Sequence, residues 1–173
     1  MKKYIHYFLS ILILSSCDSY LDTNPSDRFT QETYWTSKEN VEAAIVGIYS
    51  VLNNGNSFYA ARNMVYLDAL TPNSYQYNGD LNLISRGLHD ANTGLFNSTW
   101  NSSYEGIGRA NMVLANIDQV EFDQQLKERY KAEAKFLRAL FYFPLWNLYG
   151  GAPLITDAPN LDSQGKLPRS TPE

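Results

Sequence analysis

The sequence predicts a mostly α-helical protein, built from antiparallel helical hairpins with one long irregular loop. Apolar residues recur at helical spacing in several windows between residues 36 and 149, and capping and stop signals bound these windows. No segment shows the alternating pattern of a convincing strand. A short linker near 119–122 separates the two strongest windows, which indicates an antiparallel hairpin.

A short apolar segment opens the chain and ends at its only cysteine. Two lysines precede an apolar run over 4–14, which is about half the length that a membrane-spanning helix needs. The sequence LSSC (14–17) places small residues directly before the cysteine, as in bacterial lipoproteins. We expect a signal peptide over 1–16, lipid on Cys17 and a polar tether over 17–33. The alternative is a secreted protein with an unpaired thiol, which an oxidising compartment disfavours.

The first predicted helix spans 36–52. Thr36 and Glu39 match a capping box, and the Asn-Asn-Gly sequence over 53–55 is a stop signal. A second, less regular helix is predicted over 57–70, where a Thr-Pro pair ends it.

From residue 73 to residue 97 the helical periodicity disappears. Asn, Gly, Asp, Ser and Tyr dominate this segment. A loop of this length without structure of its own is uncommon and tends to be functional. We therefore expect any ligand contacts within this chain to come from it.

The third predicted helix begins with Ser98 as its cap and carries an apolar stripe from Trp100 to Ile117. The first residue of the stripe, Trp100, is expected in the core. Gly106 and Gly108 weaken the helix locally, and their small size favours close approach of a neighbouring helix.

The fourth predicted helix spans about 123–149 and is the longest. Pro144 lies inside its apolar stripe and is expected to kink the helix or end it early. Gly150, Gly151 and Pro153 terminate it, and an extended segment follows.

The last four residues, STPE (170–173), have the pattern of a helix start. Because no helix follows, the sequence predicts an incomplete fold. The apolar stripe of the fourth helix would then lack a partner, and the side chains expected to be stranded in water are Leu137, Phe141, Leu145 and Trp146.

The charge and the reactive groups exclude several classes of function. Cleavage after residue 16 removes two lysines and no acids, so the net charge changes from −4 to −6, which disfavours nucleic-acid binding. His89 is then the only histidine, with no nucleophile in a recognisable pattern. Asp80 and Asp90 are not expected to act as paired catalytic acids. We expect no catalytic residue, no metal site and no cofactor.

Two segments carry a resemblance to a known family. They are AEAKFLRALFYF (132–143) followed by LYGGAPLI (148–155), and a helix pattern formed by Trp100, Tyr104, Ile107, Ala110 and Asn111. With them, the chain resembles the SusD/RagB family of nutrient-binding outer-membrane lipoproteins. The resemblance implies tetratricopeptide-like hairpins, and it implies that residues 34–173 are the N-terminal part of a longer helical domain.

The resemblance also implies a function. It is that of a non-catalytic lipoprotein, anchored at the outer membrane and surface-exposed, that binds a glycan or other nutrient and delivers it to a TonB-dependent, SusC-like transporter. The candidate ligand contacts are Tyr75, Tyr77, Asn78, Asp80, Arg86 and Phe96, because aromatic faces and hydroxyl-binding side chains suit sugars. The alternatives are a helical envelope adaptor that binds another protein, and an inert truncated fragment.

Overall fold

The computed structural model describes residues 31–55, 57–75, 77 and 79–171. The chain divides into two compact units, Met1–Tyr34 and Trp35–Glu173. The described part of the first unit is one short helix, α2 (Gln31–Tyr34). The predicted signal peptide, Cys17 and most of the predicted tether therefore lie outside the described residues.

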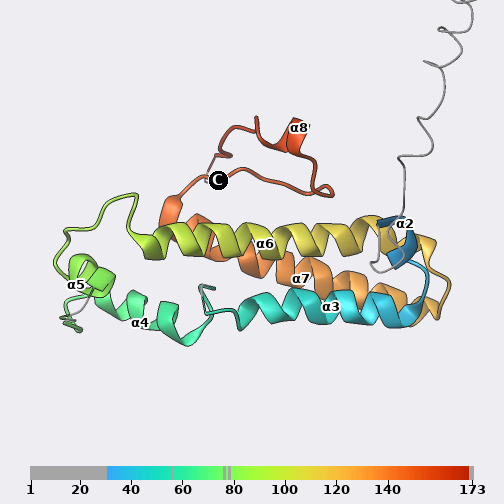
Figure 1. Ribbon diagram of the computed structural model, residues 1–173, viewed down its shortest axis with the longest axis horizontal. Helices are drawn as coiled ribbons and strands as arrows, with labels where there is room; N and C mark the ends of the chain where they lie inside the picture. Colours follow the sequence, from blue (N-terminus) through green and yellow to red (C-terminus); the bar gives the residue numbers. More distant parts are fainter. Residues whose placement is uncertain (1–30, 56, 76, 78, 172–173) are drawn as a thin grey trace, which may run out of the picture. The chain divides into compact units, whose positions relative to one another are not determined.

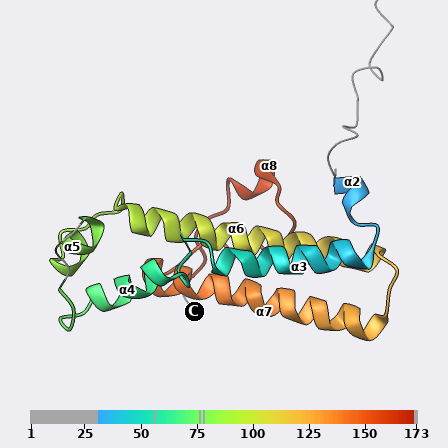
Figure 2. The same ribbon diagram turned by 60° about the horizontal axis from the view of Figure 1, so that its bottom comes forward.

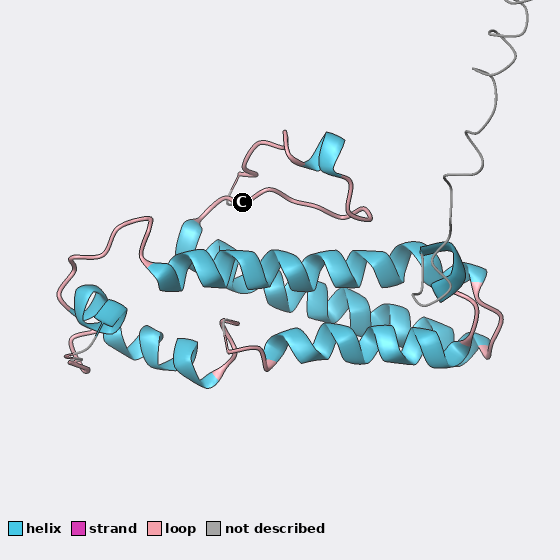
Figure 3. Ribbon diagram, viewed as in Figure 1, coloured by secondary structure: helices cyan, strands magenta, loops and turns pink. Residues whose placement is uncertain are grey.

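The second unit is helical, which confirms the predicted fold class. Its described residues form no strand, and loops join the helices (Figure 3). The elements in chain order are α3 (Lys38–Leu52), α4 (Ala61–Ala69), α5 (Gly79–Ser85), α6 (Gly94–Asn116), the 3-10 turn η1 (Ile117–Gln119), α7 (Gln124–Tyr149) and α8 (Leu161–Gln164). No helix within the described ranges is long and apolar enough to cross a membrane.

Three long helices form the body of this unit. Figures 1 and 2 show α3, α6 and α7 side by side, with α6 antiparallel to the other two. The turn η1 joins α6 to α7, so the predicted hairpin is confirmed. The short helices α4 and α5 lie near the end of the bundle where α6 begins, and they share a small apolar cluster with Leu95 of α6.

The apolar stripes of the three long helices meet in one core. Leu137, Phe141 and Leu145 are buried there, so the prediction that they are stranded in water is wrong. The reason is that α3 and α6 already cover this face of α7. Trp146 lies outside this core and is 57% exposed, as predicted for it. The other buried residues of the long helices include Val41, Ile45, Ile48, Val51, Ile107, Ala110, Val113 and Ala134.

The close approach of α6 to α7 depends on a glycine. A Cβ atom built on Gly106 would lie 2.5 Å from Cδ2 and Cζ of Phe141. A Cβ atom on Gly108 would lie 3.6 Å from Cγ of Pro159, which is an ordinary contact. The predicted role of a small residue in helix approach therefore holds for Gly106 and not for Gly108.

Several predicted helix starts are displaced. The cap of α3 is Ser37, whose hydroxyl accepts the N–H of Asn40 at 3.3 Å, and not Thr36. The cap of α6 is Thr93. Ser98 instead lies one turn inside the helix, where its hydroxyl donates to the carbonyl of Leu95 at 2.9 Å. With α5 inside it as well, the segment over 73–97 is less irregular than predicted.

The bounds of α7 agree with the prediction. The Asp123 carboxylate accepts the N–H of Leu126 at 2.8 Å and caps the helix. Gly150, with φ of 70°, ends it. Pro144 is buried inside the helix, which continues to Tyr149, so the proline does not end α7 early.

Candidate functional site

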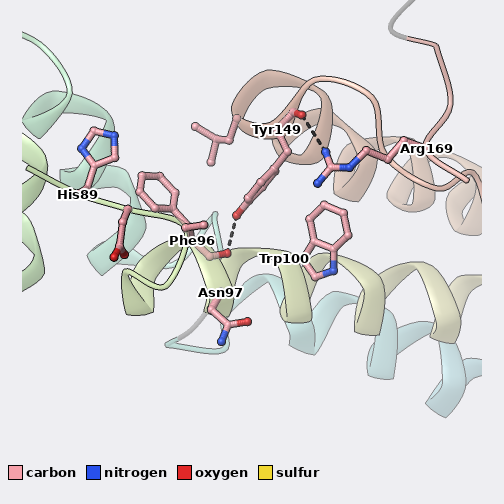
Figure 4. Close-up of a pocket in the computed structure, with 9 residues that line it drawn as sticks. His89, Phe96, Asn97, Trp100, Tyr149 and Arg169 are labelled. Atoms are coloured by element: carbon pink, nitrogen blue, oxygen red, sulfur yellow. Dashed lines mark hydrogen bonds between the residues drawn. The ribbon is translucent and has the colours of Figure 1, made fainter. Parts of the chain in front are cut away.

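A cavity of about 390 Å³ opens where the first turns of α6 pass the C-terminal end of α7 (Figure 4). The segment before α6, the start of α6, the last residues of α7 and one residue near the end of the chain contribute its walls. We call this cavity the aromatic pocket. Its lining residues are His89, Asp90, Ala91, Phe96, Asn97, Trp100, Leu148, Tyr149 and Arg169.

Aromatic rings form the centre of the pocket. The rings of Trp100 and Tyr149 meet edge to face, with centroids 5.1 Å apart and planes at 80°. The Tyr149 hydroxyl donates to the carbonyl of Phe96, which ties the end of α7 to the start of α6. Burial raises the pKa of Tyr149 to about 12, so this hydroxyl keeps its proton at neutral pH. The ring of Phe96 lies 5.3 Å from that of His89.

Arg169 supplies a fixed positive charge at one end of the pocket. Its Nη1 donates to the carbonyls of Tyr149 at 3.2 Å and Gly151 at 2.9 Å. These carbonyls lie at the C-terminal end of α7, where the helix dipole favours a cation. The guanidinium carbon lies 5.5 Å from the centroid of the Trp100 ring. The backbone carbonyls and the aromatic face together hold the guanidinium in place.

The other end of the pocket carries acceptors. Oδ1 of Asp90 accepts the N–H of Asn92 at 2.9 Å, in a turn that leads into α6. The Thr93 hydroxyl accepts the N–H of Asp90 at 3.1 Å. The Asn97 side chain lies nearby on the first turns of α6, with its carbonyl oxygen 3.4 Å from Nδ2 of Asn101. Figure 4 shows His89 at the end of the pocket opposite Arg169, and Asp90, the next residue in the chain, also lines the cavity.

The segment over 150–171, which we call the strap, brings Arg169 to the pocket. Two tyrosines hold its first part. Tyr104 of α6 donates to the carbonyl of Pro153 at 2.8 Å. Tyr142 of α7 accepts the N–H of Ile155 at 2.6 Å and lies 3.1 Å from the carbonyl of that residue. Burial raises the pKa of both tyrosine hydroxyls, so both remain protonated hydrogen-bond donors.

A polar pair completes this attachment. The Asn111 amide donates to the carbonyl of Ile155 at 2.9 Å. Arg138 donates to Oδ1 of Asn111 at 2.8 Å and to the carbonyl of Thr156 at 3.1 Å. These side chains and the two tyrosines belong to the patterns on which the family resemblance depends. Their observed contacts hold the strap and lie outside the pocket lining.

The far part of the strap returns to its beginning. The backbone N–H and the hydroxyl of Ser170 both donate to the carbonyl of Ala152, at 3.2 and 2.6 Å. Ser170 was predicted to begin a helix, and it instead fixes the position of Arg169, its neighbour in the chain. Pro172 and Glu173, the other predicted helix-start residues, lie outside the described residues.

Of the predicted ligand contacts, only Phe96 lines the aromatic pocket. Tyr75 and Tyr77 are 70% and 78% exposed and do not line it. Asp80 lies next to Gly94, at whose position a Cβ atom would meet Oδ2 at 3.0 Å. The guanidinium of Arg86, the residue that follows α5, is 3.5 Å from Oδ1 of Asn82 in that helix. Asn78 lies outside the described residues.

Sequence reasoning missed most of the pocket. Trp100 was expected in the core, yet it is only partly buried and lines the cavity. Leu148 was assigned to the apolar stripe of the fourth helix and Tyr149 to the end of that helix, and nothing near Arg169 indicated a site. The one available signal was an aromatic pair, Trp100 and Tyr104, on the first turns of a helix that carries the family pattern.

The described residues contain no group of three His, Cys, Asp or Glu side chains that could hold a metal ion. The His89 ring contacts the Phe96 ring with the two planes tilted by 53°, and Asp90 accepts hydrogen bonds from the turn before α6. The chemistry offered by the aromatic pocket is that of binding: flat apolar rings, a fixed cation and side-chain acceptors.

Comparison with known proteins gives a consistent result. A SusD-like family model, described as starch-binding associating with outer membrane, matches residues 19–173. SusD-like protein P25 of Formosa agariphila is 29% identical over 176 residues, covering 91% of this chain and 32% of the relative. A SusD-like protein of Bacteroides ovatus is 27% identical over 84% of this chain and 27% of its own length.

A solved structure shares the fold. It is a SusD-like carbohydrate binding protein from Bacteroides fragilis, with a TM-score of 0.71 and 25% identity over 81% of this chain and 29% of that protein. The chain spans about a third of the length of three SusD-like relatives from Formosa agariphila that it matches.

Proposed function

This chain belongs to the SusD-like family, and from that premise we propose that its aromatic pocket binds a sugar residue of a glycan and catalyses no reaction. The observation that carries the proposal is the combination of Trp100, Tyr149 and Phe96 with polar side chains at both ends of one cavity. Ligand sites of this kind typically enclose about 300–1,000 Å³, and this cavity encloses about 390 Å³.

The chemistry of the walls suits a sugar. A pyranose ring has an apolar face of C–H groups, which packs against an aromatic ring, and a rim of hydroxyls that need donors and acceptors. Arg169 offers donors, while Asp90 and Asn97 offer carboxylate and amide oxygens. Because the polar groups lie at the two ends and the rings lie between them, a sugar can satisfy both requirements at once.

We further propose that the protein is a lipoprotein at the outer membrane, exposed at the cell surface. This proposal is supported by the family description and by the LSSC sequence that ends at Cys17. Within it, the partner is a TonB-dependent, SusC-like transporter that receives the glycan. The acidic chain, with a net charge of −4, is unsuited to nucleic acid.

The experiment is calorimetric titration of the full chain, in detergent, with starch fragments and other oligosaccharides. Trp100→Ala should weaken binding, because an aromatic contact contributes about 0.5–1.5 kcal/mol beyond area burial, or roughly two- to tenfold in affinity. The matched control is the double variant Tyr75→Ala/Tyr77→Ala, which removes two exposed rings outside the pocket. Circular dichroism checks that each variant keeps its helices.

The outcome separates two locations for the site. Weaker binding only in the Trp100 variant supports the aromatic pocket. Weaker binding only in the tyrosine double variant would move the site to the segment around Tyr75. Absence of binding to every oligosaccharide by the unmodified chain would contradict the proposal.

One observation favours the second candidate function, that of a helical adaptor which binds another envelope protein. Phe136, Phe143 and Trp146 of α7 are 65%, 50% and 57% exposed, and they recur at helical spacing on one helix. If the protein is an adaptor that works through this face, Phe136→Ser/Trp146→Ser should impair glycan-dependent growth, whereas Trp100→Ala should leave that growth unchanged. A glycan binder that works through the pocket would show the reverse.

A further inference from the structure

We infer that the aromatic pocket prefers a sugar that carries a carboxylate, a uronic acid, and that Arg169 is the residue that selects it. The inference rests on the proposed function and specifies its ligand class. It starts from the charges that line the cavity.

Arg169 is the only lysine or arginine among the lining residues of the pocket. No ion pair among the described side chains involves it; the described pairs use Lys38, Arg109, Arg129 and Lys131. Within the described residues, this cation therefore lies in the cavity without a carboxylate paired to it, in a chain of net charge −4.

The guanidinium is held ready for a ligand. Both described hydrogen bonds of the Arg169 side chain come from Nη1, which donates to the carbonyls of Tyr149 and Gly151. The donors on Nη2 and Nε take no part in these two bonds. Figure 4 shows the second terminal nitrogen directed toward the space between Tyr149 and Trp100. A cation fixed by backbone contacts loses little conformational freedom when it binds an anion, and a planar guanidinium matches a planar carboxylate.

The opposite end of the pocket sets the orientation. Asp90 carries a negative charge there, so a carboxylate of the ligand is repelled from that end and attracted to Arg169. A uronic acid has its carboxylate on one side of the ring and hydroxyls on the other. With its apolar face on Trp100, such a sugar places the carboxylate at Arg169 and presents hydroxyls to Asp90 and Asn97.

The other arginines near this end of the molecule have different roles. Arg138 donates to Asn111 and to the strap at Thr156. Arg86 is near Asn82 on α5 and does not line the cavity. Among the described side chains, Arg169 alone therefore combines a position in the cavity with donors that no described hydrogen bond uses.

The test compares uronic-acid oligosaccharides of several backbones with their carboxyl-reduced forms, which keep the same linkages and lack the charge. The full chain in detergent is titrated with each pair by calorimetry. We expect at least one acidic form to bind about tenfold tighter than its reduced form, since hydrogen bonds between charged groups are stronger than neutral ones and partial exposure limits the gain. This preference should shrink as salt is added.

Two variants assign the preference to Arg169. Arg169→Gln should lower the ratio of acidic to neutral affinity to about one, whereas Arg169→Lys should keep part of it, because the charge remains and the fork is lost. Lys166→Gln is the matched control: it removes an exposed positive charge from the same strap outside the pocket lining, so the ratio should not change.

The outcomes distinguish the inference from the proposed function. Equal or tighter binding of the reduced forms by the unmodified chain would overturn the inference and leave glycan binding standing. A preference that persists in Arg169→Gln would overturn the assignment to Arg169. Failure of every acidic and neutral oligosaccharide to bind would overturn both. The ratio and its salt dependence are read within one protein, so a loss of stability in a variant does not imitate either result.

Discussion

The contact between Gly106 and Phe141 gives the sharpest test of how the helices pack. In Gly106→Ala the new Cβ atom would lie 2.5 Å from two carbons of the Phe141 ring, whereas carbon atoms in contact normally lie about 3.5–4.0 Å apart. Phe141 is 1% exposed, so its ring has no solvent-filled space into which to move. Overpacking of this kind typically costs about 1–3 kcal/mol.

A second glycine on the same helix provides the control. Replacing glycine with alanine inside a helix stabilises it by about 1 kcal/mol, and this gain applies equally to Gly106 and Gly108. In Gly108→Ala the new Cβ atom meets only Pro159, at 3.6 Å. The difference in unfolding free energy between the two variants therefore isolates the overpacking, and we expect Gly106→Ala to be less stable than Gly108→Ala by about 1–3 kcal/mol.

The assay is urea unfolding of each full-length variant, followed by far-ultraviolet circular dichroism. Phe141→Leu combined with Gly106→Ala should recover part of the lost stability, because the smaller side chain vacates the position of the ring edge. Equal stability of the two alanine variants, or a more stable Gly106→Ala, would refute the conclusion that α6 and α7 are closest at this glycine.

Three further predictions concern single side chains. The Asp123 carboxylate caps α7 by accepting the Leu126 N–H at 2.8 Å. Asp123→Ala removes this cap and should lower the unfolding free energy by about 0.5–2 kcal/mol, which urea unfolding measures. Burial raises the pKa of Tyr149 from 10.0 to about 12. The stability that its protonated hydroxyl contributes is therefore complete below about pH 10 and is lost as pH rises toward 12. Tyr149→Phe should flatten this part of the curve of unfolding free energy against pH. Cys17→Ala should abolish incorporation of labelled fatty acid and release the protein from membranes, and unchanged labelling would contradict the predicted lipid anchor.

Four side chains of the family pattern attach the strap to α6 and α7. Tyr104, Asn111, Arg138 and Tyr142 hold the strap by bonding to its backbone carbonyls and one N–H. Backbone groups are present whatever side chains the strap carries, so this attachment places few demands on the strap sequence. The pattern therefore accounts for the position of the strap, and two of its aromatic residues, Trp100 and Tyr149, also line the pocket.

The sequence alone determined the helices whose signals are local. Asp123 and Gly150 bound α7 because an acidic cap and a glycine with positive φ act on the nearest turn of the backbone. The stripe that contains Leu137 and Phe141 was also readable, because helical spacing puts those residues on one face. The shift of the α6 start from Ser98 to Thr93 shows the limit, since both residues are good caps and only packing selects one of them.

The tertiary structure decided which residues form the pocket. Trp100, Tyr149 and Arg169 come from the start of one helix, the end of an antiparallel neighbour and a strap that folds back over 20 residues from Tyr149. No local signal in the sequence links them. Tyr75 and Tyr77, predicted as ligand contacts from their polar, aromatic segment, are exposed and do not line this pocket. Helix signals act over one or two turns of backbone, whereas a cavity exists only where distant segments are brought together by the packing of α6 on α7 and by the hydrogen bonds that hold the strap.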